Sequence, residues 1–594
     1  MGAIHYYEKE RVFKLDTPHT SYLIGIVDEE KFLGHIYYGA KITDYDVRAL
    51  MRTGEAPFVP SQNNRDRSSF LDAFPMEYPG HGVGDYRESA ISVSDKNGNT
   101  AVQPLYRRHK IYAGKPGLPG LPATFGSEEE CETLEIVLAD EVLDLTVTLY
   151  YTAFYDVDVI ARSVRVTNHA KEPVYLTKVF SAALDLDAED YRMLTLHGSW
   201  ARERQIEYRK IGYGKQSVGS CRGESSHQEH PFVALVSANA GQEQGRVYGF
   251  HFVYSGNFLA QVEKNQFDSL RVVMGIHPQD FKWELKQDET FTAPEVVMTY
   301  SDAGLGRMTR TLHDLYRKHL IRSPYKDRER PVLINNWEAT YFDFDTEKLL
   351  AIAREAKKSG IEMLVMDDGW FGHRNDDNTS LGDWQVNEQK ITGGLKRLVD
   401  QVNEIGLKFG IWFEPEMISP DSELYRTHPD WAIALPGRTP CRSRNQYVLD
   451  LSRKEVRDYA YECVASVLRS ANIAYVKWDM NRQLTDLGSG VLPVEKQGEL
   501  LHRYVLGVYE LQERLITEFP ELLLENCSGG GARFDPGMLY YSPQIWCSDD
   551  TDAIERLKIQ EGTALLYPLS AIGAHVSDCP NHTVGRVTPF ETRG

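Results

Sequence analysis

Apolar residues occupy every second position over much of the first 300 residues. From Leu143 to Leu149, leucine and valine alternate with aspartate and threonine, and the same pattern returns at Val164 and Val166. Alternation with a period of two predicts β-strands that have one buried and one solvated face. Many short strands with turn residues between them, and little helical period, predict a large β-sandwich over residues 1–302.

The period of the pattern changes near residue 303. The run from Leu305 to Leu320 has helical spacing, and a charged segment follows from Arg322 to Pro331. Residues 303–330 are therefore predicted to form a helical linker.

Strands and helices alternate after this linker. A buried strand is predicted at 332–337, and Asp345 is placed to cap a helix that ends at Gly360. Further apolar runs of strand length are found at 363–366, 409–413, 475–478, 522–524, 545–547 and 572–576. Repeated β-α units of this length indicate a parallel sheet, and their number predicts a (β/α)8 TIM-type barrel over residues 331–594.

Almost every strand of this predicted barrel ends in polar or charged residues. These strand ends are Trp337-Glu338, 367–370, 412–416, 477–479, 525–531 and 547–552. In a barrel, the carboxyl ends of all strands meet at one face, where catalytic residues lie. One such end alone would be a solvated corner, but six together predict a polar pocket.

The stretch 475–481 is the most informative of these strand ends. If it is a strand, Lys477, Asp479 and Asn481 share one face, because successive side chains point to opposite faces. An unpaired buried charge costs roughly several kcal/mol, so these groups must be paired or must line a polar site. For this pair alone, a structural salt bridge between Lys477 and Asp479 would be the favoured interpretation. The other strand ends favour a site instead.

Composition narrows the class of partner. The 594 residues are 42% hydrophobic and 26% charged, as in a soluble globular protein of two or three domains, with a net charge of −20. This charge argues against nucleic acid or a membrane as partner and favours a neutral ligand. No signal peptide or membrane span is recognised. The seven cysteines lack CxxC spacing, which indicates reduced thiols and a cytoplasmic location.

Several carboxylates around one pocket could hold a metal ion or perform acid–base chemistry. Lys477 argues against a metal, because an ammonium group repels a cation, and His227 and His230 lack a third ligand. No metal and no cofactor are therefore predicted. A lysine, an asparagine and carboxylates suit the hydroxyl groups of a neutral sugar, with Trp370 and Trp412 as apolar faces for its ring.

Glycoside hydrolysis needs two carboxyl groups in different protonation states. Asp479 lies beside Lys477, which favours the ionised form that a nucleophile requires. Asp549 is next to Asp550 and near Asp552, whose like charges favour the protonated form that a general acid requires. The distance between the two groups does not follow from the sequence, so retention and inversion both stay open at this point.

Seven motifs carry a resemblance to a known family. They are Tyr-Pro-x-x-Gly-x-Gly-Asp at 78–85, Asp-Asp-Gly-Trp-Phe-Gly at 367–372, Leu-Gly-Asp-Trp at 381–384, Trp-Phe-Glu-Pro-Glu-Met at 412–417, Lys-Trp-Asp-Met-Asn-Arg at 477–482, Cys-Ser-Gly-Gly-Gly at 527–531 and Cys-Ser-Asp-Asp-Thr-Asp at 547–552. Together they closely resemble glycoside hydrolase family 36, over essentially the whole length of the chain.

The resemblance implies a retaining α-galactosidase that removes terminal α-1,6-linked galactose from oligosaccharides such as melibiose and raffinose. Asp479 matches the nucleophile of the family, which forms a covalent galactosyl ester, and Asp549 matches its acid/base. Asp367 and Asp368 match the pair that binds the 4- and 6-hydroxyls of galactose. The other residues that match positions around the sugar are Trp337, Trp412, Arg444, Lys477, Asn481, Cys527 and Gly529.

The resemblance also implies an assembly and a departure from the family pattern. Family members are often homotetramers whose N-terminal loops reach a neighbouring active site, as the loop 57–87 could do here. They continue beyond the last residue of this chain, so we expect a truncated barrel without the family's C-terminal β domain, with an exposed sheet edge and weak activity and stability. Eight barrel strands are found in the sequence only if residues 447–450 are counted as one of them. In the family, the nucleophile follows the fourth barrel strand. With residues 447–450 included, Asp479 would follow the fifth strand, so by the family pattern this segment is an extra strand and the eighth is missing.

Three alternatives to this function stay open from sequence. Two use the same chemistry: a galactosyl transferase of the same family, and an α-N-acetylgalactosaminidase. They differ from the leading prediction in the acceptor and in the substituent at the 2-position of the sugar. The third belongs to another class and is an inactive sugar-binding fragment.

Overall fold

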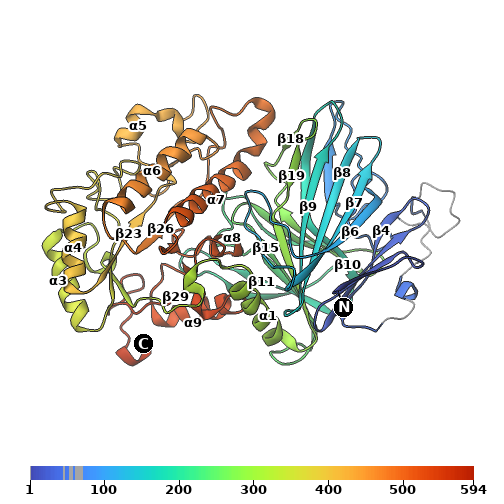
Figure 1. Ribbon diagram of the computed structural model, residues 1–594, viewed down its shortest axis with the longest axis horizontal. Coiled ribbons are helices and arrows are strands. Elements are labelled where there is room, and N and C mark those ends of the chain that lie inside the picture. Colours follow the sequence, from blue (N-terminus) through green and yellow to red (C-terminus); the bar gives the residue numbers. More distant parts are fainter. Residues whose placement is uncertain (1, 44–46, 52–57, 61–70, 594) are drawn as a thin grey trace.

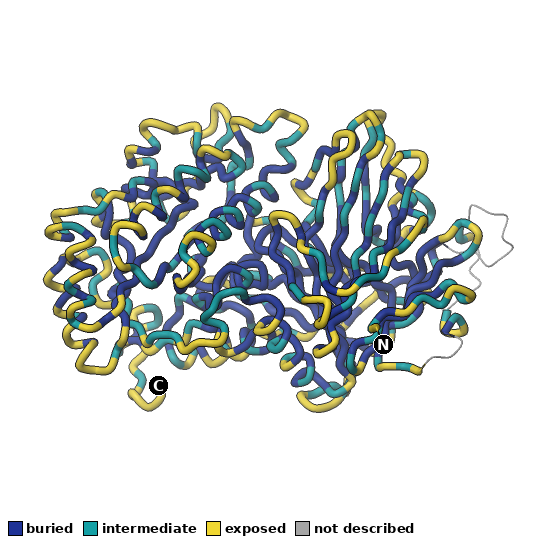
Figure 2. Tube along the Cα trace, viewed as in Figure 1, coloured by how far each residue is buried: buried dark blue, intermediate teal, exposed yellow. Residues whose placement is uncertain are grey.

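The computed structural model describes residues 2–43, 47–51, 58–60 and 71–593. A β-rich part that contains the N-terminus and an α/β part that contains the C-terminus lie side by side along the long axis (Figure 1). Buried segments run through the interior of both parts and through the region where they meet (Figure 2).

Three antiparallel sheets build the N-terminal part. The four-stranded sheet consists of β1 (Ile4–Tyr7), β2 (Val12–Asp16), β3 (Thr20–Val27) and β4 (Phe32–Ala40). The six-stranded sheet consists of β13 (Gly214–Ser220), β16 (Phe258–Lys264), β17 (Ser269–Ile276), β10 (Val174–Asp187) and β18 (Trp283–Leu285), with β5 (Ile91–Ser94) beside β10. The ten-stranded sheet consists of β12 (Gln205–Lys210), β11 (Tyr191–His197), β14 (Phe232–Ser237), β15 (Val247–Val253), β20 (Glu295–Ser301), β9 (Val159–Asn168), β8 (Leu145–Phe154), β7 (Cys131–Asp140) and β6 (Leu105–Ala113), with β19 (Thr290–Thr292) beside β9.

Burial along the strands follows the predicted alternation in some strands and not in others. In β8, Leu145, Val147 and Leu149 are buried while the threonines between them are partly exposed. Every residue of β14, β15 and β20 is buried instead. β15 and β20 contact both the six-stranded sheet and the helix α1 (Gly304–His319), so both of their faces are covered.

A buried charge network joins the sheets of the N-terminal part. The Glu77 carboxylate accepts hydrogen bonds from Tyr22 (2.6 Å) and Tyr151 (2.7 Å) and forms an ion pair with Arg162 (3.1 Å). Arg162 also donates to the carbonyl oxygen of Ala183 on β10, at 2.6 Å. Because Glu77 and Arg162 are almost inaccessible to solvent, each charge depends on the other for compensation.

The segment predicted as a helical linker contains α1 and a short 3-10 turn, η2 (Pro324–Lys326). One face of α1 packs on β20 and β15. Its other contacts reach the C-terminal part, where Thr309 and His313 donate to the carbonyl oxygens of Leu565 (2.9 Å) and Ala564 (2.8 Å). α1 therefore fixes the two parts to each other.

A parallel sheet forms the centre of the C-terminal part, and its strands follow each other in chain order. They are β21 (Leu333–Asn335), β22 (Met363–Met366), β23 (Lys408–Phe413), β26 (Tyr475–Trp478), β27 (Leu523–Asn526), β28 (Gln544–Trp546) and β29 (Ile572–Gly573). The longer helices of this part are α3 (Thr346–Lys358), α4 (Leu395–Ile405), α6 (Lys454–Ser470), α7 (Leu500–Glu518) and α9 (Ala553–Ala564). The predicted cap is confirmed, since Asp345 Oδ1 accepts from Lys348 N at 2.9 Å at the start of α3.

The sheet has seven strands among the described residues, so the count of eight that included residues 447–450 is wrong. Within that segment, β25 (Tyr447–Val448) pairs antiparallel with β24 (Met417–Ile418), outside the parallel sheet. The strand that carries Lys477 is thus the fourth of the series, as the family pattern implied. The remaining short helices are α2 (Trp337–Thr340), α5 (Glu423–Thr427), α8 (Pro536–Leu539) and α10 (Phe590–Arg593).

Two further predictions can be compared with the structure only in part. No helix in the described ranges is both long and apolar enough to cross a membrane. Of the predicted intersubunit loop 57–87, residues 57 and 61–70 lie outside the described residues.

The Glu77 network yields a stability prediction. Replacement Arg162→Met removes the arginine from a buried carboxylate and leaves it with Tyr22, Tyr151 and His35 as partners, which should destabilise the protein by about 3–5 kcal/mol. We expect the first thermal unfolding transition of the whole chain, followed by calorimetry, to fall by at least about 5 °C.

Arg317→Met is the matched control, because the side chains of Arg317 and its partner Asp314 are 45% and 44% exposed. Exposed ion pairs contribute at most about 1 kcal/mol, so this variant should melt within about 2 °C of the wild type. Similar melting temperatures for both variants would show that the buried pair carries no special stability.

Candidate active site

The carboxyl ends of the parallel strands bring the predicted site residues to one edge of the sheet. Asp367 and Asp368 follow β22, Trp412 lies at the end of β23, and Asp479 follows β26. Trp337, Cys527 and Asp549 follow β21, β27 and β28, while Lys477 lies within β26 and Asn481, Gly529 and Arg444 lie on the adjoining loops. Neighbouring strands run parallel in register, so residues far apart in sequence become neighbours.

Asp479 is a buried carboxylate, and each of its two oxygens accepts two hydrogen bonds. Oδ1 accepts from the backbone N–H groups of Met480 (2.9 Å) and Gly529 (3.3 Å). Oδ2 accepts from the Trp412 indole (3.1 Å) and the Asn481 amide (2.8 Å). Four donors on two oxygens fix the orientation of the carboxylate.

Charge keeps Asp479 ionised in spite of its burial. Burial raises the pKa of Asp479, but the positive charges of Lys477 and Arg444 and hydrogen bonds from Asn481 and Cys527 together leave it below its usual value. The ionised state agrees with the expectation from sequence and suits a nucleophile.

Glu414 is a second carboxyl group in contact with this network. Its Oε1 accepts from Gln446 (2.5 Å) and from the backbone N–H of Asn481 (2.6 Å), and its Oε2 accepts from the Asn481 side chain (2.9 Å). Burial and the charge of Asp479 raise the pKa of Glu414 to about 7, although Arg444 lowers it. Glu414 was part of a predicted strand end, but its proximity to Asp479 was missed, because they lie on different strands.

Lys477 forms its ion pair with Asp367 rather than with Asp479, so the salt bridge considered from sequence is wrong. Lys477 Nζ lies 3.2 Å from Asp367 Oδ2 and 5.5 Å from the centre of the Trp546 ring. The same Asp367 oxygen accepts from the Asn335 side chain at 2.6 Å. Burial lowers the pKa of Lys477, but Asp367 and other acidic groups raise it well above its usual value, so the ammonium group stays charged.

Asp368 is bound by one arginine in a bidentate geometry. Arg374 Nε and Nη2 each lie 2.9 Å from an oxygen of Asp368, and both side chains are buried. A carboxylate has about four lone-pair sites, so two acceptor positions are left for a ligand hydroxyl. Asp367 accepts the backbone N–H of Asp368 at 2.9 Å, which fixes the two carboxylates relative to each other.

The two tryptophans predicted as sugar faces have other positions. Trp370 is completely buried and packs against Phe371, Trp384 and Phe413, so its predicted contact with a ligand is wrong. Its indole N–H donates to the carbonyl oxygen of Trp412 at 2.9 Å. Trp412 in turn directs its own N–H at Asp479, and therefore contributes an edge to the site.

Arg444 lies in the electrostatic range of several acidic groups of the site. Its backbone has a φ of 49°, in the left-handed region. Burial lowers the pKa of its guanidinium, but the carboxylates of Glu414, Asp368, Asp479 and Asp549 raise it, and the resulting pKa lies above its usual value. Arg444 thus balances negative charge from both predicted catalytic groups.

The loop 527–531 closes over the Asp479 side of the site. Burial, followed by the negative charge of Asp479, raises the pKa of Cys527 well above its usual value, so its thiol is neutral. Gly529 has a φ of +50° and donates its N–H to Asp479. The carbonyl oxygen of Gly529 accepts from His227 Nε2 at 2.6 Å. A residue of the N-terminal part therefore binds the same glycine whose N–H contacts the carboxylate.

His227 and His230, considered as metal ligands from sequence, bind different partners. His230 Nε2 lies 2.7 Å from the hydroxyl group of Tyr567. The described ranges contain no group of three histidines, cysteines or acidic residues placed to hold a metal ion. Both histidines have structural contacts instead.

Asp549 is held by two indole groups. Trp546 Nε1 lies 3.2 Å from Oδ1, and Trp200 Nε1 lies 3.0 Å from Oδ2. Trp200 comes from the N-terminal part, 349 positions away in sequence, so no local pattern could identify it.

The acidic neighbours of Asp549 are compensated by arginines. Asp550 pairs with Arg202, and Asp552 lies 3.2 Å from Arg586. Asp552 also caps α9 by accepting from the backbone N–H of Glu555 at 3.1 Å. The like charges that the sequence placed beside Asp549 are therefore largely neutralised by ion pairs.

Trp337 and Glu338 form the side of the site next to β21. The Trp337 ring lies edge-on to Tyr341 and Phe342, with centroids 5.2 Å and 5.1 Å apart. Glu338 lies 3.3 Å from His575 and 3.0 Å from His582. Because both histidines hold its carboxylate, Glu338 connects this side to the segment after β29.

Glu416, at the end of the same strand-end motif as Glu414, has a structural role. Arg533 binds it through two nitrogens at 2.7 Å and 3.0 Å, and Trp478 and Tyr504 donate to it at 2.8 Å and 2.5 Å. Its oxygens are thus occupied within the protein.

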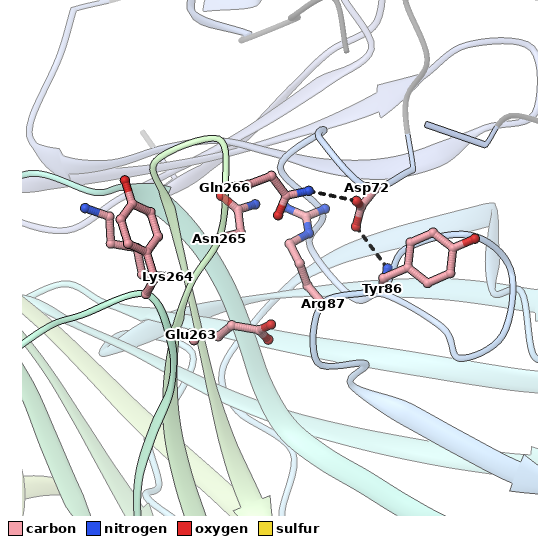
Figure 3. A pocket seen from close by; sticks show the side chains of 9 residues that line it. Asp72, Tyr86, Arg87, Glu263, Lys264, Asn265 and Gln266 are labelled. Carbon is pink, nitrogen blue, oxygen red and sulfur yellow. Dashed lines mark hydrogen bonds between the residues drawn. The ribbon is translucent and has the colours of Figure 1, made fainter. Parts of the chain in front are cut away.

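A cavity of about 600 Å³ lies in the N-terminal part and is lined by Asp72, Tyr86, Arg87, Tyr213, Gly214, Glu263, Lys264, Asn265 and Gln266 (Figure 3). Asp72 accepts from Tyr86 (3.1 Å) and from Gln266 (3.1 Å), and Arg87 is bound by Asp85 and Asp185. Because the polar groups of Asp72 and Arg87 already bind partners within the protein, we place the candidate active site at the strand ends and not in this cavity.

Two family models match the chain: the Glycosyl hydrolase family 36 N-terminal domain over residues 31–286, and Melibiase over residues 290–594. The boundary between the two matches falls before β19, so the Melibiase match contains β19, β20 and α1 as well as the C-terminal part.

The chain is similar to α-galactosidases of known sequence and structure. It is 52% identical to α-galactosidase AgaA of Geobacillus stearothermophilus and 48% identical to α-galactosidase Mel36A of Lactobacillus acidophilus, and each alignment covers 100% of this chain and 81% of the relative. The crystal structure of AgaA matches with a TM-score of 0.97 over 98% of this chain and 81% of AgaA. A variant of AgaA in complex with raffinose matches with a TM-score of 0.96, at the same identity and coverage.

The raised pKa of Glu414 yields a prediction for stability. A folded-state pKa of about 7, above the ordinary value of 4.5, means that the folded protein binds this proton more tightly than the unfolded chain. The stabilisation is complete below pH 4.5 and is lost as the pH rises through about 7. The wild type should therefore lose stability relative to Glu414→Gln over this window, by on the order of a few kcal/mol.

Melting temperatures of wild type and variant between pH 4.5 and pH 8 measure this difference. Glu404→Gln, which changes an exposed carboxylate on α4, is the control and should give a small, constant difference. A constant difference for Glu414→Gln as well would overturn the assignment of a buried carboxyl group that titrates near neutrality.

Proposed function

Because the chain belongs to glycosyl hydrolase family 36, we propose that it is an α-galactosidase. It acts from the non-reducing end and hydrolyses terminal α-1,6-linked galactose of oligosaccharides such as melibiose and raffinose. The observation that carries the proposal is the pair Asp479 and Asp549, which follow β26 and β28 at the same edge of the sheet and whose charges both raise the pKa of Arg444. The match to AgaA, whose variant is known in complex with raffinose, supports the substrate class.

The reaction proceeds by double displacement with retention. Asp479, ionised and fixed by four donors, attacks the anomeric carbon while the glycosidic bond breaks, and Asp549 gives its proton to the departing oxygen. Asp549 then takes a proton from water, the water oxygen attacks the same carbon, and the ester bond to Asp479 breaks. Family resemblance and the donors around Asp479 support these roles.

Selectivity for galactose comes from hydrogen-bond acceptors and donors that bind the hydroxyl groups of the sugar. Asp367 and Asp368 bind the 4- and 6-hydroxyls, and Lys477 contributes a cation between them and the reacting carbon. Glucose differs in the orientation of its 4-hydroxyl and would leave buried polar groups unpaired, so it is rejected strongly. The other residues that contact the sugar are Trp337, Trp412, Arg444, Asn481, Cys527 and Gly529.

Three further features belong to the same proposal. The seven parallel strands, which follow each other in chain order, are strands of a (β/α)8 barrel that is preceded by a β-sandwich. The protein is a homotetramer, as family members often are, and acts in the cytoplasm. Sequential parallel pairing supports the first feature, and the family resemblance and the spacing of the cysteines support the other two.

Substitution of the two acidic residues tests the proposal. With nitrophenyl α-galactoside, Asp479→Ala should lower kcat/KM by on the order of 10⁴-fold or more, because no covalent ester can form. With melibiose, Asp549→Ala should lower it by about 10²- to 10⁴-fold, because the leaving group lacks its proton donor. Asp421→Asn, an exposed carboxylate on the same part of the protein, is the control and should match the wild type.

A fluorinated galactoside that accumulates as the covalent intermediate identifies the nucleophile directly. Mass spectrometry of the labelled, digested protein should place the sugar on Asp479. Full activity of Asp479→Ala, or a label on another residue, would contradict the proposed mechanism.

A further inference from the structure

The carboxyl group of Glu414 binds one residue of the site, Asn481, at two points. Glu414 follows β23 directly, and its Oε1 accepts from the backbone N–H of Asn481 at 2.6 Å. Its Oε2 accepts from the side-chain nitrogen Nδ2 of Asn481 at 2.9 Å. Because one carboxyl group binds both the main chain and the side chain of Asn481, it limits the rotation of that side chain.

Two acceptors orient the amide of Asn481. Its nitrogen carries two hydrogens, of which one is donated to Glu414 Oε2 and the other to Asp479 Oδ2 at 2.8 Å. An amide turned over would place its own oxygen against oxygens of both carboxyl groups. The orientation with the nitrogen toward Glu414 and Asp479 is therefore strongly favoured.

This orientation leaves the carbonyl oxygen of Asn481 available to a ligand. In the described part of the chain, the hydrogen bonds of the amide are the two made by its nitrogen. Oδ1 lies on the side of the loop 527–531, since a Cβ atom on Gly529 would be 3.7 Å from it. An acceptor that the protein does not use thus lies beside the proposed nucleophile.

The position of Asp479 indicates which group of the sugar this oxygen meets. The proposed nucleophile attacks the anomeric carbon, and Asn481 binds the nucleophile, so Asn481 lies close to the substituents next to that carbon. The ring oxygen and the glycosidic oxygen carry no hydrogen to donate. The nearest donor is the 2-hydroxyl group, whose hydrogen bonds strengthen in the transition state of glycoside hydrolysis.

A second amide lets Glu414 bind or release a proton and still hold Asn481. Gln446 is completely buried and donates to Glu414 Oε1 at 2.5 Å, while its own Oε1 has no partner among the described residues. If the Gln446 amide turns over, this oxygen can accept a proton carried on Glu414 Oε1. Glu414 Oε2 then accepts from Asn481 Nδ2 in both protonation states.

We propose that Glu414 is a positioning residue of the reaction, an inference that rests on the proposed function. It fixes the Asn481 amide so that the carbonyl oxygen of Asn481 accepts from the 2-hydroxyl group of the galactosyl unit. Glu414 acts on the sugar only through Asn481, and takes no part in the exchange of bonds.

Two substrates with the same leaving group isolate this role. Nitrophenyl α-galactoside carries the 2-hydroxyl group, and nitrophenyl 2-deoxy-α-galactoside lacks it. The quantity to be measured on the full chain is the ratio of kcat/KM for the first substrate to kcat/KM for the second. Losses that affect the nucleophile or the proton donor equally for both substrates cancel in this ratio.

Two variants of Glu414 should lower this ratio. Glu414→Met removes both acceptors, and the ratio should fall about 10-fold, the effect of one hydrogen bond. Glu414→Gln places an N–H group against one of the two donors of Asn481, and the ratio should fall about 3-fold or more. Most of the loss should be in kcat, because the bond to the 2-hydroxyl group strengthens in the transition state.

A double variant tests whether Glu414 acts through Asn481. Asn481→Ala should lower the ratio at least as far as Glu414→Met does, because it removes the acceptor itself. Glu414→Met combined with Asn481→Ala should then give the same ratio as Asn481→Ala alone, because two residues that act through one contact are not additive.

Glu525→Gln is the matched control, because Glu525 is also buried and accepts from a glutamine side chain, that of Gln544, at 2.5 Å on β27. It should leave the ratio unchanged. Thermal melting shows whether each variant is folded, and if Glu414→Met is not, the ratio for Glu414→Gln decides.

The outcomes separate this inference from the function on which it rests. A wild type without activity on nitrophenyl α-galactoside would overturn the proposed function itself. An active wild type whose ratio is unchanged in the Glu414 variants would overturn this inference alone. A ratio that falls further in the double variant than in Asn481→Ala would do the same.

Discussion

The candidate active site depends on one constraint, namely that several acidic side chains are buried close together. Asp367, Asp368, Glu414 and Asp479 are all buried at the ends of three neighbouring strands. Uncompensated charges in such a place would cost several kcal/mol each, roughly, so the fold supplies cations at fixed positions. Those cations are Lys477, which pairs with Asp367, Arg374, which binds Asp368, and Arg444, whose pKa is raised by the charges of Asp368, Glu414 and Asp479. Glu414 differs from the others because its raised pKa lets it hold a proton near neutrality.

The N-terminal part takes a direct share in this arrangement. His227 binds the carbonyl oxygen of Gly529, whose own N–H donates to Asp479, and Trp200 donates to Asp549. Glu203 links the loops that carry these two groups. The β-rich half therefore reaches both acidic residues of the proposed reaction. Its contribution comes from the segments between strands: β11 and β12 flank Trp200 and Glu203, and β13 and β14 flank His227.

The sequence predicted the features that depend on local pattern. Alternation indicated the strands of the N-terminal part, and polar strand ends indicated the pocket, because parallel strands align their carboxyl ends. Contacts between strands could not be predicted in the same way. Lys477 pairs with Asp367 on a strand two positions away in the sheet, although Asp479 is closer in sequence. Trp370 reads like Trp412 in sequence and both are buried, but only the Trp412 indole donates to Asp479, whereas that of Trp370 donates to a backbone carbonyl.

Gly529 has a consequence for any attempt to divide the molecule. Its carbonyl oxygen is bound from one half of the chain and its N–H donates to the carboxylate in the other half. A hybrid that joins the first half of one relative to the second half of another would have to preserve this bridge. Exchange of segments 198–230 and 527–552 as one unit keeps it intact, whereas a cut at the boundary near α1 takes the residue that binds Gly529 from one relative and Gly529 itself from the other.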